Sequence, residues 1–193
     1  MSTTLNGAIE VYNEHAETWM FMMDTFNLFY QDYGIFATLF GVRNYIDINP
    51  VAANRGVPSD ISKEAKSIIT NSKYNSDYSF IMFEELKSIN RDLTTNKKLS
   101  IQCDRKGNII ENGFIANEEY SYLKNEIVVE NKDLIVFENT NIANLKRYFQ
   151  NRNILATEIL NSNWEFKLLY QVMEVISKKH KGQNIRWLVS FST

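Results

Sequence analysis

Residues 33–62 combine an aromatic helix with a loop that holds both prolines of the 193-residue chain. Phe36, Leu39 and Phe40 recur at helical spacing, and Gly41 loosens a helix that we expect to run over 32–44. The loop then passes through Pro50 and Pro58 before a short helix predicted over 62–70, with Ser59 or Ser62 as its cap. A buried helix that leads into a proline-restrained loop is a rigid support for binding residues.

Arg43 and Arg55 give this stretch two interpretations. In the first, both arginines are structural: Arg43 satisfies free carbonyl groups at the helix end, and Arg55 pairs with Asp32, Asp47 or Asp60. In the second, they form an anion pocket with the helix N-terminus at 59–63, where a phosphate is held and aromatic rings stack on a base.

The second interpretation yields a set of predicted ligand-binding residues. They are Tyr33, Arg43, Asn44, Arg55, Asp60 and Ser62. No catalytic residue, metal ligand or cofactor is predicted, because the sequence contains no phosphate-binding glycine motif and only one cysteine and two histidines, which are distant from each other.

The same stretch resembles a family of small proteins from bacteriophages and prophages. Its members carry an RDY-x-LFA-x-L-x-x-VRN helix, an RG-L-P-x-D-V-S loop, an S-W-L-T-L-x-EL segment and a characteristic final strand. The matching residues here are Asp32-Tyr33, Ile35-Phe36-Ala37, Leu39, Val42-Arg43-Asn44, Ile48, Pro50, Arg55-Gly56-Val57-Pro58, Asp60-Ile61-Ser62, Ser79–Leu86 and Ile185–Phe191. Relatives have histidines where this chain has Glu10 and Tyr78. If those histidines serve metal binding or acid–base chemistry, this chain has lost that chemistry.

Composition limits the partners. A net charge of −2 argues against bulk nucleic-acid binding, which is typical of basic domains. No apolar run approaches the ~20 residues of a membrane span, and the first residues lack the pattern of a signal peptide. With Cys103 as the only cysteine, we expect a reducing compartment, the host cytoplasm.

The remaining pattern predicts an α+β fold: a mainly antiparallel sheet with helices packed on it, in a single domain over 1–193. We expect a hairpin over 8–23, a strand over 79–83, a short helix over 84–90, and a last strand over 185–191 that joins the hairpin. Residues 95–138 are predicted to form a β-rich insertion or lobe.

Two further helices are predicted near the C-terminus. The first begins after 139–141 and has an apolar face of Ile142, Leu145 and Phe149. The second runs over 163–179 with Ser162 or Asn163 as its cap, and its predicted apolar stripe consists of Trp164, Leu168, Val172, Val175 and Ile176.

These observations favour a phage-encoded, non-catalytic binding protein that interferes with host defence by sequestering a nucleotide-type signal. The alternative is an inhibitor that binds a host defence protein, such as a nuclease, through the β-rich segment. A hydrolase or transferase is the third hypothesis. The expected partner is therefore a small anionic, nucleotide-like ligand or a host defence protein, without bulk nucleic acid or membrane, and self-association is left open.

Overall fold

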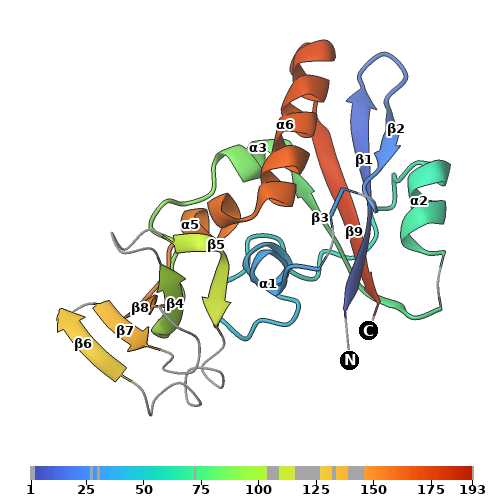
Figure 1. Cartoon of the computed structure of the whole chain (residues 1–193). Helices are drawn as coiled ribbons and strands as arrows, with labels where there is room; N and C mark the ends of the chain where they lie inside the picture. Colours follow the sequence, from blue (N-terminus) through green and yellow to red (C-terminus); the bar gives the residue numbers. More distant parts are fainter. Residues whose placement is uncertain are drawn as a thin grey trace.

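A computed structural model of the chain describes residues 3–26, 28–29, 31–71, 73–103, 109–115, 127–131, 134–138 and 146–192. Its first sheet has four antiparallel strands in the order β2-β1-β9-β3 (Figure 1). The strands are β1 (Thr4–Asn13), β2 (Thr18–Asp24), β3 (Asn75–Met82) and β9 (Ile185–Ser192). The predicted hairpin and its pairing with the C-terminal strand are therefore confirmed.

Within the described ranges, five helices complete the α+β fold that the sequence predicts. They are α1 (Tyr33–Phe40), α2 (Lys63–Ile69), α3 (Phe83–Lys87), α5 (Ala156–Ser162) and α6 (Trp164–Lys179). Asp32, Ser62 and Asn163 cap α1, α2 and α6, because each side chain accepts a hydrogen bond from a backbone N–H in the first turn. Of the three capping residues, Ser62 and Asn163 lie where the sequence predicts.

One face of the first sheet packs on α1 through aromatic rings. The ring centroids of Phe36 and Phe191 are 5.0 Å apart, and those of Phe40 and Trp187 are 5.5 Å apart. Trp187 and Phe191 belong to alternate positions of β9, so they point to the same side of the sheet. These rings form the centre of the main core, to which α5 and α6 also contribute.

The other face of the sheet is covered by α2. Leu188 of β9 and Ala8 of β1 pack there against Ala65 and Ile69 of α2. The central strands β1 and β9 are consequently buried on both faces, which explains why Ile185–Phe191 is an almost continuous apolar run. Figure 1 shows α2 on the opposite side of this sheet from α1 and α6.

A second antiparallel sheet has the strand order β5-β4-β8-β7-β6. Its strands are β4 (Leu99–Cys103), β5 (Ile109–Ile115), β6 (Ile127–Asn131), β7 (Leu134–Glu138) and β8 (Lys146–Arg152). The β character predicted for 95–138 is present in the described parts of that segment, and β8 extends the sheet to Arg152. Leu99 and Ile101 of β4 are buried in the main core, so the second sheet shares that core.

The helix predicted after 139–141 is wrong over its second half. Lys146–Arg152 is a strand, which pairs with β4 on one side and β7 on the other; residues 139–145 lie outside the described part of the chain. The apolar spacing that favoured a helix is outweighed by backbone pairing to two neighbours, a tertiary effect that local spacing does not reveal.

The predicted stripe of α6 is also misplaced. Trp164 and Val175 are 57% and 63% exposed, whereas Phe166, Leu169 and Met173 are the buried residues. Val172 and Ile176 are partly buried and pack against the main core. The core-facing side is thus rotated from the predicted one, because α5, a helix that the sequence analysis did not predict, packs beside α6 (Figure 1).

Candidate functional site

The loop after α1 folds back onto the helix that it leaves. Gly41 ends α1 with a φ of +76°, in the left-handed region that favours glycine. The backbone N–H groups of Val51 and Ala52 then donate to the carbonyl oxygens of Thr38 and Leu39, at 3.1 and 2.7 Å. The helix therefore ends at Phe40, earlier than predicted, and the loop is held by its own backbone.

Asn44 closes this loop. Its Nδ2 donates to the carbonyl oxygen of Ile48 at 2.7 Å, and its Oδ1 accepts from the Ile48 N–H at 3.1 Å. Both ends of the amide are thus used by the backbone of one residue. This geometry supports a structural role for Asn44.

Arg43 lies among neutral oxygens. Its Nε donates to Thr3 Oγ1 at 2.9 Å and its Nη1 to the Tyr45 hydroxyl at 3.2 Å, while the Tyr33 hydroxyl accepts from the Thr3 N–H at 3.3 Å. The predicted contact of Arg43 with carbonyl groups at the helix end is wrong. No carboxylate among the described residues pairs with Arg43, and Tyr33 and Tyr45 are exposed beside it.

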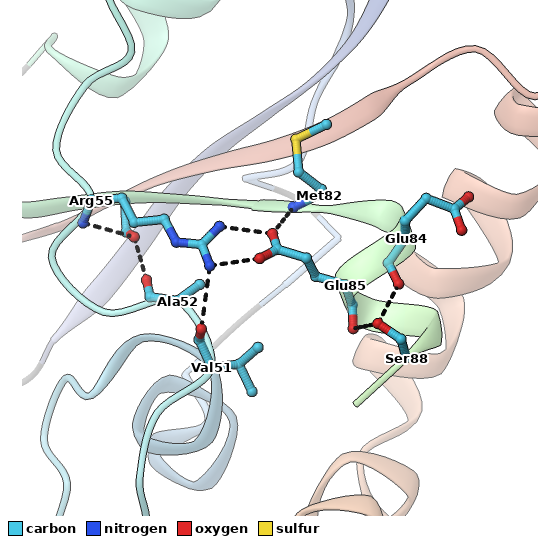
Figure 2. A network of polar contacts seen from close by, with 8 residues as sticks. Val51, Ala52, Arg55, Met82, Glu84, Glu85 and Ser88 are labelled. Carbon is cyan, nitrogen blue, oxygen red and sulfur yellow. Dashed lines mark hydrogen bonds and ion pairs between the residues drawn. The ribbon is translucent and has the colours of Figure 1, made fainter. Parts of the chain in front are cut away.

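Arg55 forms a two-point ion pair with Glu85 (Figure 2). Each of its terminal nitrogens lies 2.7 Å from one Glu85 carboxylate oxygen, and Nη2 also donates to the Val51 carbonyl at 3.3 Å. Glu85 additionally accepts from the Met82 N–H at 2.8 Å. Hydrogen bonding and charge from Arg55 lower the pKa of Glu85 despite partial burial. Arg55 therefore pairs with Glu85 and not with Asp32, Asp47 or Asp60, the partners that the sequence predicts.

Asp60 belongs to a different cluster, which joins the first and last strands. Arg186 donates from Nε to Glu10 Oε2 and from Nη1 to Asp60 Oδ1, both at 2.8 Å. The Arg186 guanidinium lies 3.8 Å from the centroid of the Trp19 ring, and the Trp19 indole N–H donates to Asp60 at 2.9 Å. Burial raises the pKa of Asp60, but Arg186 and Trp19 together hold it below its usual value.

Ser62 connects that cluster to α2. Its Oγ accepts from the Ala65 N–H at 3.2 Å as the helix cap, and its own N–H donates to Glu10 Oε1 at 2.8 Å. Glu10 is fully buried and Arg186 is 3% exposed. The sequence analysis did not predict that Glu10 and Arg186 are the partners of Asp60 and Ser62. The signal that could have found them is a charged residue within each of two strands that are otherwise buried.

The predicted site residues are thus divided among separate local networks. Tyr33 and Arg43 meet through Thr3, Asp60 and Ser62 meet through Glu10 and Arg186, and Asn44 bonds to its own loop. Arg55 and Arg186 both lie near the Phe80 ring, at 5.4 and 5.9 Å from its centroid. Their polar contacts hold the loop and α2 against the sheet.

A pocket of about 310 Å³ lies elsewhere, between α3, α5 and α6. Three cationic side chains line it: Lys87 and Arg91 from α3 and the turn after it, and Lys167 from α6. Lys87 is paired with Glu84, but Arg91 and Lys167 pair with no carboxylate in the part of the chain that the structure describes. No described acidic residue lines the pocket. Figure 1 shows the three helices next to one another.

Apolar and neutral polar groups complete the pocket. Leu86, Leu160 and Phe166 are buried residues on its lining, and Tyr170 packs against Phe83 with ring centroids 5.2 Å apart. Asn161 and Gln171 bring side-chain amides, which offer both donors and acceptors. An apolar floor with a few convergent polar and charged groups is typical of small-molecule sites.

Comparison of the chain with protein-family models, with curated proteins and with solved structures found no match. Within the described ranges, no helix has the length and hydropathy needed to cross a bilayer. The same ranges contain no group of three or more histidine, cysteine, aspartate or glutamate side chains placed to bind a metal ion.

Proposed function

We propose that this chain is a phage-encoded, non-catalytic binding protein that sequesters a small anionic, nucleotide-like ligand and thereby interferes with host defence. The observation that carries the proposal is the pocket between α3, α5 and α6, where two of the three lining cations, Arg91 and Lys167, have no carboxylate partner among the described residues. Unpaired guanidinium and ammonium groups are the usual partners of phosphate in proteins.

The ionic state of the nearby carboxylates supports binding without turnover. Glu85 and Glu158, which lie in or beside the elements that form the pocket, are each paired with an arginine. Arg152 lowers the pKa of Glu158 as Arg55 lowers that of Glu85. A general acid or base at neutral pH needs a pKa shifted toward 7, and these two shift away from it.

A second candidate function is inhibition by direct contact with a host protein. It is favoured by the surface patch of Tyr33, Arg43 and Tyr45, in which Arg43 donates to the exposed Tyr45 and is linked through Thr3 to the exposed Tyr33. Tyrosine and arginine are enriched among the residues that dominate protein–protein binding energy.

The proposal is tested by expressing the chain in a bacterial host, purifying it and identifying what remains bound after denaturation by mass spectrometry. We expect an intact phosphate-bearing small molecule that is absent from a Lys167→Glu variant. A bound protein without any small molecule would favour the contact inhibitor. A chemically altered ligand would show that the chain is an enzyme.

A further inference from the structure

The charge of the pocket matches a ligand with about two negative charges. Arg91 and Lys167 are the two cations without a carboxylate partner in the described ranges, whereas the charge of Lys87 is offset by Glu84. A phosphate monoester carries about −1.5 to −2 at neutral pH. A triphosphate would bring more negative charge than these side chains can balance, so the electrostatics favour a single terminal phosphate.

The size of the pocket points the same way. A volume of about 310 Å³ is near the lower end of the ~300–1,000 Å³ observed for small-molecule sites. Such a volume suits one nucleotide unit. A second nucleotide would have to extend into solvent, away from the lining groups.

The uncharged lining is suited to an aromatic base. The ring of Tyr170 is half-buried and is positioned by its contact with Phe83, and the Phe166 ring is buried on the same lining. Bases stack on such rings without strong preference among themselves. The amides of Asn161 and Gln171 add donors and acceptors of the kind that bind base edges.

Resting on the proposed function, we infer that the ligand is a nucleoside monophosphate. Arg91 and Lys167 hold the phosphate, and the base packs against Tyr170. Lys87 contributes less to phosphate binding because its charge is offset by Glu84. The phosphate and the ring contacts act together, so neither half of the ligand binds well by itself.

Calorimetric titration of the full chain at low salt tests this inference. The probes are AMP, GMP, CMP, UMP, adenosine, inorganic phosphate, ADP and ATP. We expect at least one monophosphate to bind at least about tenfold more tightly than adenosine and than inorganic phosphate. Adenosine lacks the charged hydrogen bonds of the phosphate, and inorganic phosphate lacks the stacking of the base. Lys167→Gln and Arg91→Gln should each weaken it about tenfold or more.

Matched variants control for general effects. Lys179→Gln makes the same substitution at an exposed position on the same helix outside the pocket, and it should leave affinity unchanged. Tyr170→Leu should weaken binding while Tyr170→Phe, which keeps the ring, should not.

The other outcomes separate the two claims. Adenosine binding as tightly as AMP would overturn the role of the phosphate. ADP or ATP binding more than tenfold tighter than every monophosphate would overturn the monophosphate assignment but leave the proposed anion binding intact. If no phosphate-bearing probe binds, both fail.

Discussion

Gly7 and Trp187 lie so close that no side chain fits at residue 7. A Cβ atom placed on Gly7 would be 2.7 Å from Trp187 Nε1, and that same indole N–H donates to Thr25 Oγ1 at 3.0 Å. Trp187 is fully buried among the rings of Phe29 and Phe40. The glycine on β1 therefore allows the largest aromatic residue of β9 to occupy the centre of the core.

Gly7→Ala should destabilise the fold by about 1–3 kcal/mol or more, because the added methyl group has to displace both the Thr25 hydroxyl and the Trp187 indole in a close-packed core. Urea denaturation followed by fluorescence measures the free energy of unfolding. Gly56→Ala is the control: Gly56 has a φ of +73° but no atom near its missing Cβ, so that change costs only backbone strain of about 1 kcal/mol. A larger loss at Gly56 than at Gly7 would contradict the packing argument.

Removing Arg186 should cost about 3–5 kcal/mol, because the buried Glu10 carboxylate then loses its cation, whereas removing Glu10 should cost less, because Asp60 still pairs with Arg186. Glu10→Gln and Arg186→Met, alone and combined, form a double-mutant cycle read by chemical denaturation. We expect the combined loss to be clearly smaller than the sum. Strictly additive losses would mean that the two side chains do not depend on each other.

The ion pair of Arg55 and Glu85 should make stability depend on acid pH. Arg55 lowers the folded-state pKa of Glu85, so the stabilisation is complete above the unfolded pKa of about 4.3 and is lost as pH falls through the lower folded-state value. Urea titrations of wild type and Glu85→Gln should therefore differ most near pH 6–7, and the difference should shrink toward pH 3. A difference that stays constant across this range would exclude the ion pair as its cause.

Helix α6 should tolerate changes at Val175, an exposed position of the stripe that the sequence pattern predicted to be buried. Leu169→Ala should cost about 2–5 kcal/mol, since Leu169 is fully buried. Val175→Ala should change stability by no more than about 0.5 kcal/mol, because Val175 is exposed. Equal losses at both positions in denaturant titrations would show that the helix is rotated from the orientation described.

Local signals in the sequence were sufficient for much of the fold. The cap at Ser62, the cap at Asn163 and the strand Ile185–Ser192 follow from neighbouring residues, and each is present. Lys146–Arg152 was mispredicted because its strand form depends on pairing with β4 and β7, which are distant in sequence. The predicted apolar stripe of α6 is misplaced for a related reason. The apolar spacing alone does not show which side of the helix α5 covers.

The candidate site was harder to predict than the fold. Arg55 pairs with Glu85, thirty residues away, and Arg186 pairs with Glu10 across 176 residues, so neither partner could be read from spacing. The pocket combines side chains from α3, α5 and α6, and no single segment carries a recognisable motif for it. Most polar groups of the predicted residues in 33–62 already bond to other parts of the chain, and ligand binding by these residues stays a prediction.

We propose that the anion site lies between α3, α5 and α6 and not in the 33–62 stretch. The decisive experiment titrates the tightest-binding nucleoside monophosphate into three proteins: wild type, the Arg91→Gln/Lys167→Gln double variant, and Arg43→Gln. We predict that the double variant loses detectable binding while Arg43→Gln retains the wild-type dissociation constant. Loss of binding in Arg43→Gln, with the double variant unaffected, would contradict this account.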